Sequence, residues 1–375
     1  MEKKNLKISF CIVSMNRLHQ LKETLLRNIA DNADYPDLEV ILLNYNSADG
    51  MEEWVKEALG DHIATGRIVY YKTPDPSHFR HSHAKNLAFK LSNGDIICSI
   101  NADHFAGKGF ARYVNNAFMQ DPGIVLTTID YPRSRPGYMP AKDVLGKVCV
   151  SKRDFLKIKG FEERMKSYGF EDYDLVNRLE MAGIKRVLIE DLSFLHYIPH
   201  DEEDRYNMED VGSYTVYIHH ISTFLSEIIF LGPHHHYRRY AVTDNFSKDA
   251  DNCIYAYKRR LFDFQFTLED PDPEEGVWQD GTGAICFSPD RGKPYTLYRS
   301  GTQVLSVSGD KANGAIFHRL THLHNLKSLL NFNYLIPNRC FMEKNVRQKV
   351  IAAGSDNYGN ATVYRNFDAS PLYIP

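Results

Sequence analysis

The chain has 375 residues and a formal net charge of −3 at pH 7, and 43% of its residues are hydrophobic. This charge balance excludes the strongly basic surface of a nucleic-acid-binding protein. The length allows a large core, and no apolar run reaches the length of a membrane span, so we expect no transmembrane segment.

The first hundred residues alternate between the patterns of strands and helices. Near-continuous apolar runs predict strands buried on both faces at residues 6–14, 38–44, 67–72 and 95–100. Helical spacing of apolar residues predicts helices at residues 18–29, 51–59 and 82–91. This alternation over short links indicates the α/β class: a Rossmann-like, mostly parallel open sheet, flanked by helices and wound with right-handed crossovers.

Polar residues follow three of these strands directly. They are Ser14-Met15-Asn16-Arg17, Asn44-Tyr45-Asn46-Ser47 and Asn101-Ala102-Asp103-His104. Because open α/β sheets bind ligands outside the carboxyl ends of their strands, we expect these residues to line a binding site. The first strand is followed neither by the Gly-x-Gly-x-x-Gly of dehydrogenases nor by a Walker A loop.

The segment Tyr168-Gly169-Phe170-Glu171-Asp172 leads into a predicted helix. Leu175 and Leu179 lie one turn apart on one face of that helix. Asp174 and Arg178 can pair on the opposite face. Glu171 and Asp172 fall in the loop and the first turn, where the helix N-terminus stabilises negative charge. A carboxylate held there can act as a general base, or it can simply complement the helix dipole.

Six cysteines occur without the Cys-x-x-Cys spacing of redox or metal motifs, and Cys11 and Cys98 fall inside apolar runs. The apolar run that follows Glu2-Lys3-Lys4-Asn5 is too short and too interrupted for a signal peptide. Reduced thiols in a cytoplasmic protein, at most peripheral to the inner face of the membrane, are therefore expected.

Residues 211–375 carry no motif that names a function. Residues 219–231 are apolar but interrupted by Glu227, and they predict a buried or interfacial helix. Short strands are predicted at 284–288, 295–299 and 303–308, and a helix at the start of 325–335. His318 and His322 have the spacing of a zinc-binding helix without its glutamate, which favours a structural role. We expect an α+β C-terminal extension over these residues.

Taken in order, these motifs resemble the GT-A fold glycosyltransferases, most closely the inverting, nucleotide-sugar-dependent family 2. The resemblance covers roughly residues 5–205 and is carried by motifs in the family's order. These are the three strand ends above, Lys85-Asn86 at a helix start, Gly94-Asp95 before a strand, Gly146–Phe155, Lys159–Glu163 and the Tyr-Gly-x-Glu-Asp segment, which is similar to the Trp-Gly-x-Glu-Asp of galactosyl- and N-acetylgalactosaminyl-type enzymes. The predicted domains are a GT-A domain over residues 1–210 and the extension over 211–375. We expect the extension to cover the acceptor side or to mediate self-association as a homo-oligomer.

The resemblance implies a transferase that moves a hexose or N-acetylhexosamine from a nucleotide sugar, preferably UDP-linked, with inversion, as in polysaccharide biosynthesis. The acceptor is a hydroxyl of a saccharide or a lipid-linked saccharide. It implies that Asp172 is the base and that Glu171 binds acceptor hydroxyls. The residues implied in donor binding are Ser14, Asn16, Arg17, Asn44, Asn46, Lys85, Asn86, Asn101, Ala102 and Asp103.

A divalent cation, Mn²⁺ or Mg²⁺, is implied for neutralising the diphosphate that leaves. Asp103 is the expected carboxylate ligand. A strand predicted at 185–195 is followed by His196 and His200, and we expect His196 before His200 as a further ligand.

The chain departs from the family pattern at two acidic positions. Asn44 replaces the aspartate that accepts a hydrogen bond from uracil, although its amide oxygen can still accept. Asn101 replaces the first acid of Asp-x-Asp, and Lys85 replaces a common arginine. A degenerate domain that binds nucleotide sugar or glycan without catalysis is therefore the alternative. Nucleotidyl transfer on the same fold is less favoured, because it needs a Gly-rich phosphate loop after the first strand.

Overall fold

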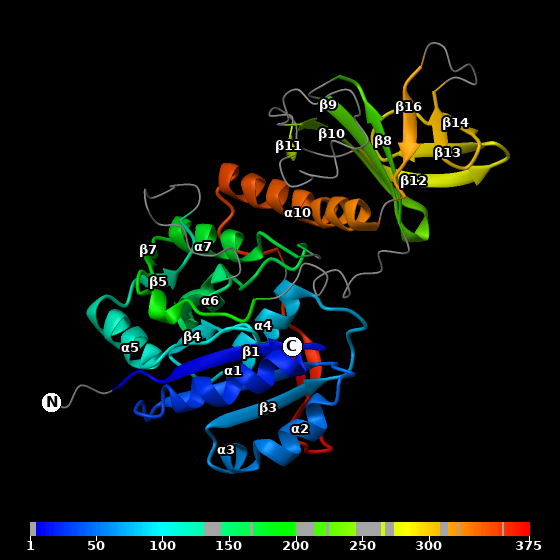
Figure 1. Ribbon diagram of the computed structural model, residues 1–375. Helices are drawn as coiled ribbons and strands as arrows, with labels where there is room; N and C mark the ends of the chain where they lie inside the picture. Colours follow the sequence, from blue (N-terminus) through cyan, green and yellow to red (C-terminus); the bar gives the residue numbers. More distant parts are fainter. Residues whose placement is uncertain are drawn as a thin grey trace. The chain divides into compact units, whose positions relative to one another are not determined.

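The computed structural model describes residues 5–130, 144–165, 168–199, 214–222, 225–244, 264–266, 274–307, 314–321, 323–354 and 356–375. It divides the chain into two compact units, Met1–His200 with Phe341–Pro375, and Asp201–Cys340, which we describe one at a time (Figure 1). The residues expected to form one C-terminal extension, 211–375, are thus shared between the two units, and the last of them fold with the first unit.

The first unit is built on a nine-stranded sheet in the order β18-β17-β3-β2-β1-β4-β6-β5-β7. Its strands are β1 (Ile8–Ser14), β2 (Leu38–Tyr45), β3 (Ile68–Thr73), β4 (Ile96–Ser99), β5 (Ile124–Thr127), β6 (Val148–Ser151), β7 (Lys185–Leu188), β17 (Ala361–Arg365) and β18 (Pro371–Ile374). The centre is parallel, because β1 pairs with β2 and β4, and β2 pairs with β3. β6 lies antiparallel between β4 and β5, and β17 adds antiparallel to β3.

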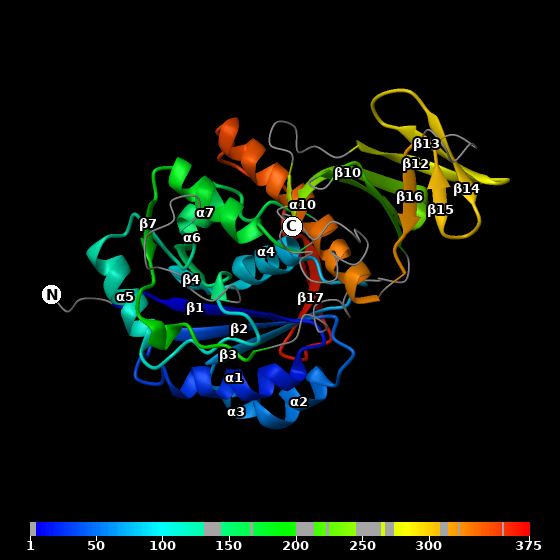
Figure 2. The same cartoon turned by 45° about the horizontal axis from the view of Figure 1, so that its top comes forward.

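Helices cover both faces of this sheet (Figure 2). They are α1 (Leu18–Ala30), α2 (Met51–Ala58), α3 (Gly60–Ala64), α4 (His81–Leu91), α5 (Phe110–Gln120), α6 (Lys152–Lys157) and α7 (Glu171–Met181). The predicted fold class is confirmed, and the predicted elements of the first hundred residues agree with the structure to within two residues at each end. The strand predicted at 185–195 ends early at Leu188. A 3₁₀ turn, η2 (Leu192–Phe194), follows it, because the Asp191 carboxylate accepts from the Ser193 N–H and favours a turn.

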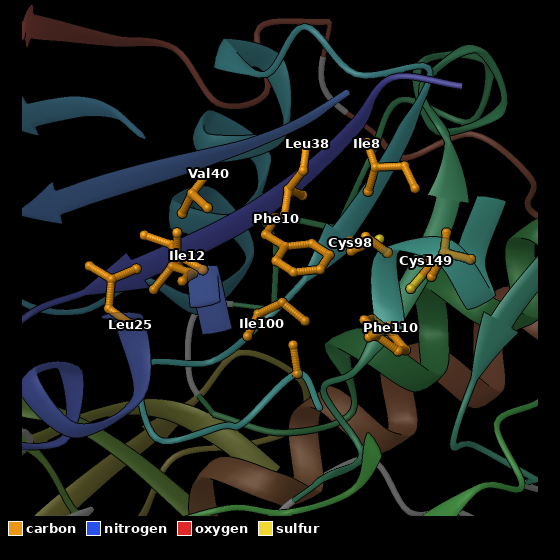
Figure 3. Close-up of a cluster of buried hydrophobic side chains, with 14 of the residues drawn as sticks. Ile8, Phe10, Ile12, Leu25, Leu38, Val40, Cys98, Ile100, Phe110 and Cys149 are labelled. Atoms are coloured by element: carbon orange, nitrogen blue, oxygen red, sulfur yellow. The ribbon is translucent and has the colours of Figure 1, made fainter. Parts of the chain in front are cut away.

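The largest core cluster packs the apolar residues of the central strands against α1 and α5 (Figure 3). Phe10 and Phe110 contact each other there, with ring centroids 5.9 Å apart. Both faces of β2 are buried, which explains why its sequence is a continuous apolar run rather than an alternation. Cys11, Cys98 and Cys149 are buried free thiols in these strands.

The second unit is an antiparallel sheet that closes on itself, because β9 pairs with both β8 and β10. Its strands are β8 (Thr215–His220), β9 (Leu225–Leu231), β10 (His236–Asp244), β11 (Phe264–Phe266), β12 (Glu274–Gly281), β13 (Ala284–Pro289), β14 (Tyr295–Ser300), β15 (Val304–Ser306) and β16 (Ile316–Arg319), with a 3₁₀ turn, η4 (Pro233–His235). The helix α10 (Leu323–Arg347) leaves this unit and ends in the first. Tyr217, Ile229, Phe287 and Phe317 belong to a core cluster of this barrel-like unit.

The helix predicted at residues 219–231 is wrong, because β8 and β9 occupy that segment. Ile228 and Phe230 belong to one core cluster of the second unit, whereas Ile229 and Leu231 belong to another. Since both faces of β9 are buried, the sequence has no period-two pattern that would identify a strand. The three short strands predicted beyond it are confirmed by β13, β14 and β15, and the helix predicted at the start of 325–335 is part of α10.

His318 lies on β16, so it does not belong to a helix, and His322 lies outside the described residues. No helix in the described part of the chain combines the length and the apolar character that crossing a membrane requires.

Candidate functional site

The carboxyl ends of the central strands lie in register at one edge of the first sheet. Ser14 of β1 is opposite Asn44 of β2, and Tyr45 of β2 is opposite Thr73 of β3. β1 lies between β2 and β4, so the order of the strands along the sheet reverses at β1. Open α/β sheets bind ligands at such a point. The buried hydroxyl oxygens of Ser14, Thr73 and Ser82 have no hydrogen-bond partner among the described residues. This edge therefore offers buried polar atoms that a ligand can satisfy.

Hydrogen bonds of Asn16 and Asn46 tie the loops after β1 and β2 to each other and to the loop after β3. Asn16 and Asn46 both adopt left-handed backbone conformations, with φ of 56° and 58°. The Asn16 N–H donates to Ser47 Oγ over 3.0 Å, and the Asn16 Oδ1 accepts from the Ala48 N–H over 2.8 Å. Asn46 Nδ2 donates to the Pro76 carbonyl over 2.8 Å. Asparagine tolerates this conformation better than most residues, which accounts for both positions.

Asn44 is buried and has partners at both ends of its amide. Its Nδ2 donates to Tyr70 Oη over 2.9 Å, and its Oδ1 accepts from the Ser47 N–H over 2.8 Å. The predicted contact of Asn44 with uracil remains a prediction, and in this structure the side chain holds the loop after β2. Arg17 lies half-buried directly before α1, at the same edge.

The two adjacent polar residues of α4, Lys85 and Asn86, hold segments that come later in the chain. Asn86 Oδ1 accepts from the Phe161 N–H over 2.7 Å, and its Nδ2 donates to Glu163 Oε1 over 2.9 Å. Lys85 Nζ lies 3.0 Å from Glu171 Oε1, and 2.7 and 2.8 Å from the two carboxylate oxygens of Asp172. The structure thus brings the expected donor-side helix directly onto the expected catalytic acids.

Glu171 and Asp172 are the first two residues of α7, as predicted, and both are buried. Gly169 and Phe170 precede them with φ of 99° and 64°, so the chain enters the helix through two left-handed residues. A left-handed backbone is unfavourable for a bulky residue such as Phe170, and such strain is common at functional sites. The Tyr168 ring is half-buried against the His81 ring of α4, with centroids 5.3 Å apart.

The two carboxyl groups of the pair titrate differently. Burial raises the pKa of Asp172 to about 6, with the Lys85 ammonium opposing that rise and the neighbouring Glu171 charge adding to it. Burial would also raise the pKa of Glu171, but Lys85 and His81 outweigh it and hold that pKa below its ordinary value. Although burial opposes it, the two carboxylates raise the pKa of Lys85. Asp172 is therefore the carboxylate that can exchange a proton near neutral pH.

Gly146 places Asp172 beside the Asn101-Ala102-Asp103 segment after β4. A Cβ at position 146 would lie 3.1 Å from Asn101 Nδ2 and 3.3 Å from Asp172 Oδ2. The side chains of Asn101 and Asp172 therefore meet around Gly146, which has no side chain of its own to separate them. The sequence places Gly146 at the start of the motif Gly146–Phe155, but it does not show that this glycine lies against Asn101 and Asp172.

Asp103 and His196 lie on neighbouring segments, and their role as metal ligands remains a prediction. The Ile198 N–H donates to the Asp103 carbonyl over 2.8 Å, and the Phe105 N–H donates to the His196 carbonyl over 3.0 Å. These bonds flank an antiparallel bridge between His104 and Tyr197. His104 Nε2 lies 4.0 Å from Asp103 Oδ1, so the Asp103 carboxylate lies close to the buried His104 ring.

Lys147 joins the two segments that carry Asp103 and His196. Its side chain is buried, and its ammonium donates to the Phe105 carbonyl over 2.9 Å and to the Phe194 carbonyl. It thus links the loop after β4 to η2. Burial lowers the pKa of Lys147 to about 8.

The described residues contain no group of three histidine, cysteine, aspartate or glutamate side chains placed to hold a metal ion. Asp103 is partly exposed and His196 is exposed. His200 lies outside the described residues, so its place among the expected ligands stays a prediction.

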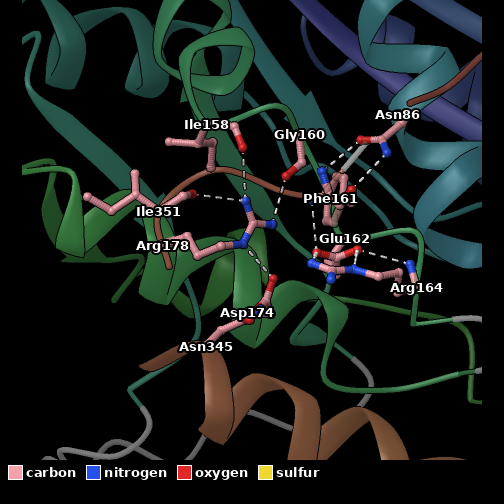
Figure 4. Close-up of polar contacts among 11 residues, drawn as sticks. Asn86, Ile158, Gly160, Phe161, Glu162, Arg164, Asp174, Arg178, Asn345 and Ile351 are labelled. Atoms are coloured by element: carbon pink, nitrogen blue, oxygen red, sulfur yellow. Dashed lines mark hydrogen bonds and ion pairs between the residues drawn. The ribbon is translucent and has the colours of Figure 1, made fainter. Parts of the chain in front are cut away.

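A network that the sequence did not predict anchors α7 to the end of the chain (Figure 4). Arg178 donates to Asp174 over 2.6 Å and to the Gly160 carbonyl over 2.7 Å, with both side chains of the pair fully buried. Asn345 of α10 donates to the other oxygen of Asp174 over 2.8 Å. The Asp174–Arg178 pair forms as predicted, but it is buried under the C-terminal residues of the same unit.

His83 joins the edge of the sheet to the same C-terminal segment. Its Nε2 lies 2.9 Å from the Asn360 carbonyl, and its Nδ1 lies 2.7 Å from Tyr45 Oη. Since a carbonyl can only accept, Nε2 carries the proton and Nδ1 accepts from the Tyr45 hydroxyl. The Gly359 N–H donates to Glu163 Oε1 over 2.7 Å, which adds a second tie to the loop that Asn86 holds.

Residues 9–179 match the model of the family described as Glycosyl transferase family 2. No curated protein matches the chain.

Several solved structures are similar to the chain at low identity. The mannosyltransferase PcManGT from Pyrobaculum calidifontis, in complex with GDP-Man and Mn²⁺, has 18% identity and a TM-score of 0.44, and the match covers 54% of this chain and 61% of that one. S. aureus TarS in complex with UDP has 16% identity and a TM-score of 0.42, covering 54% and 63%. The catalytic domain of Drosophila β1,4-galactosyltransferase 7 with xylobiose has 15% identity and a TM-score of 0.36, covering 53% and 73%.

This chain covers less than two thirds of the first two of these proteins, and the ligands named for them are not carried over. The predicted family rests instead on the matched segment, which runs from β1 to α7 and contains the Asn101-Ala102-Asp103 and Glu171-Asp172 motifs. Residues 9–179 thus match a glycosyltransferase domain of the family 2 type, which supports the predicted resemblance.

Proposed function

We propose that this chain transfers a hexose or N-acetylhexosamine from a nucleotide sugar, UDP-linked, to a hydroxyl of a saccharide or a lipid-linked saccharide. The observation that carries the proposal is the buried Glu171–Asp172 pair, which Gly146 places beside the Asn101-Ala102-Asp103 segment. A domain that only binds sugars has no need of a buried carboxylate with a pKa near neutrality.

In the proposed reaction, Asp172 accepts the proton of the acceptor hydroxyl while that oxygen attacks the anomeric carbon. The new bond joins the acceptor oxygen to the anomeric carbon, and the bond between that carbon and the diphosphate oxygen breaks. Its electron pair leaves with the nucleoside diphosphate. A single displacement of this kind inverts the anomeric configuration. Glu171, with its lowered pKa, stays ionised and accepts hydrogen bonds from acceptor hydroxyls.

The residues on the donor side fit a divalent cation that keeps several ligands from the substrate. Asp103 and His196 lie on the two segments that the bridge between His104 and Tyr197 joins, and both side chains can be reached from solvent. Two protein ligands leave room for diphosphate oxygens and water, as is usual for Mg²⁺ and Mn²⁺ in phosphate chemistry. Such an ion, when bound, neutralises the charge that develops on the leaving diphosphate.

The alternative, a domain that binds nucleotide sugar or glycan without transfer, has one observation in its favour. Asn44, Asn46, Lys85 and Asn86, all expected at the donor, have protein partners in this structure. A loss of donor contacts would leave a site that recognises only the acceptor.

A screen of donors separates the two functions. The full chain is incubated with UDP-, GDP- and dTDP-sugars and Mn²⁺, and release of the nucleoside diphosphate is measured with and without saccharide acceptors. We expect release with UDP-sugars that increases when the correct acceptor is present. Release from GDP- or dTDP-sugars alone would contradict the UDP assignment, and binding without release would favour the alternative.

A further inference from the structure

The Lys85 ammonium has three N–H groups, and three carboxylate oxygens lie within hydrogen-bond distance of it. They are Glu171 Oε1 at 3.0 Å, Asp172 Oδ1 at 2.7 Å and Asp172 Oδ2 at 2.8 Å. Only 8% of Lys85 is exposed, and its ammonium lies 5.3 Å from the centre of the Phe161 ring. The donor capacity of Lys85 is therefore already used inside the protein.

The groups around the two carboxylates explain why a cation is needed there. Two adjacent buried carboxylates cannot both ionise without a compensating positive charge. The helix α4 supplies Lys85, which contacts both carboxylates, and His81, whose charge acts on Glu171. The groups that meet Asp172 around position 146 are neutral, namely Gly146 and Asn101. In the described part of the chain, Lys85 is thus the cation that contacts Asp172.

We infer that Lys85 is a positioning residue, whose ammonium holds Glu171 and Asp172 side by side and keeps Asp172 ionised, and that it does not bind the donor diphosphate. The inference rests on the proposed function only where Asp172 takes the acceptor proton. Burial and the Glu171 charge both favour protonation of Asp172, and Lys85 opposes them, which leaves its pKa at about 6. Removal of the ammonium would leave a proton on the pair at neutral pH.

Three variants of the full chain test this role. Lys85→Met removes the charge and keeps an unbranched side chain, whereas Lys85→Arg keeps the charge. Lys22→Met, at an exposed position on α1, is the matched control. Transfer is measured from pH 5 to 9, and the affinity for UDP with Mn²⁺ is measured in parallel.

We expect Lys85→Met to move the acidic limb of the transfer rate to higher pH, and at a pH on that limb transfer should be about tenfold slower for each unit of displacement. The affinity for UDP should stay unchanged. In Lys85→Arg the acidic limb of the transfer rate should lie close to that of the unsubstituted protein. Weaker UDP binding with an unmoved limb would overturn the inference, because Lys85 would then bind the diphosphate.

A second readout needs neither donor nor acceptor, so it separates this inference from the proposed function. Melting temperatures of the unliganded proteins are compared from pH 5 to 9. In Lys85→Met the folded-state pKa of the acid pair rises, so the folded state binds more protons than the unfolded state, and stability is lost as pH increases. The melting temperature of Lys85→Met should therefore fall further below that of the unsubstituted protein as the pH increases.

If the melting temperature of Lys85→Met is lower by the same amount at every pH, Lys85 contributes only packing, and the inference is overturned. The double variant Lys85→Met, Glu171→Gln removes one charge of each sign and covers the case in which the single variant does not fold. It should melt closer to the unsubstituted protein than Lys85→Met does at pH 8. If the double variant is no more stable than the single one, the ammonium does not compensate the acid pair.

Discussion

Asp174 and Arg178 form an ion pair with atoms 2.6 Å apart, and both side chains are essentially inaccessible to solvent. The pair lies on the same helix as Glu171 and Asp172, and Arg178 also donates to the Ile158 and Gly160 carbonyls. It therefore fixes α7 against the segment that Asn86 holds from the other side. The positions of the two catalytic candidates depend on this buried contact.

Arg178→Met should destabilise the first unit by about 3–5 kcal/mol, because it leaves Asp174 charged and buried without its cation. The free energy of unfolding is measured by chemical denaturation. Arg27→Met is the matched control, since Arg27 also pairs with an aspartate four residues away, Asp31, but 69% of its side chain is exposed. The control should lose no more than about 1 kcal/mol. Equal losses in the two variants would contradict the role given to the buried pair.

Gly359→Ala tests the contact between the C-terminal segment and α4. Gly359 has φ of 64°, and a Cβ there would lie 3.0 Å from the backbone of Asn86 and Leu87. Gly66→Ala carries the same left-handed backbone penalty, with φ of 73°, but its Cβ would meet nothing within 4 Å. We expect Gly359→Ala to lower the melting temperature further than Gly66→Ala and to slow transfer. If both variants melt alike, the C-terminal segment does not press on α4.

Gly146→Ala should slow transfer strongly while the fold persists. The added Cβ would crowd Asn101 Nδ2 and Asp172 Oδ2 at 3.1 and 3.3 Å, and both side chains would have to shift by a few tenths of an ångström. A misplaced base costs more in rate than in stability. The rate of transfer and the melting temperature are measured together, and a normal rate would show that Asp172 is not poised beside Asn101 in the reaction.

Asp103→Ala should abolish the Mn²⁺-dependent part of UDP binding, because the diphosphate loses its bridging cation. His196→Ala should weaken metal dependence more than His200→Ala does. Titration of Mn²⁺ against each variant in the presence of UDP measures both effects. A stronger effect at His200 would reverse the order, and unchanged affinity in both histidine variants would remove histidine from the site.

The pattern of apolar runs was sufficient to predict the centre of the first sheet, because strands buried on both faces and their short links leave little choice of topology. It also located the acid pair at the start of α7, since Gly169 and the helix spacing mark that point. It could not predict partners that are distant in sequence. The contacts of Lys85 with Glu171 and Asp172 span more than eighty residues, and local pattern carries no record of them.

The end of the chain escaped prediction for the same reason. β17 pairs with β3, and its sequence does not say which strand it joins. The helix α10 continues through Pro337, which removes a backbone donor and usually marks a helix end. In the barrel-like unit, strands were predicted correctly only where they are short and separated by glycine-containing turns, as at β13 and β14.

The dependence of transfer on pH follows from the pKa of Asp172. Because burial raises that pKa to about 6, the rate should fall about tenfold per unit below pH 6 and level off above it. The rate is measured at saturating donor and acceptor. A limb near pH 4 would mean that the base is a carboxylate with an ordinary pKa, outside the buried pair.

The most direct measurement of the central claim compares Asp172→Asn with the unsubstituted chain, in transfer and in UDP binding. The amide has the same shape and cannot accept the acceptor proton, so transfer should fall by about 10²–10⁴-fold, the usual contribution of a general base. Binding of UDP and the fold should be preserved, although the melting temperature should fall because Lys85 loses an ionised partner. Glu171→Gln should mainly raise the KM for the acceptor. Near-normal turnover by Asp172→Asn would contradict the account, and Asp172 would then only cap the charge at the N-terminus of α7.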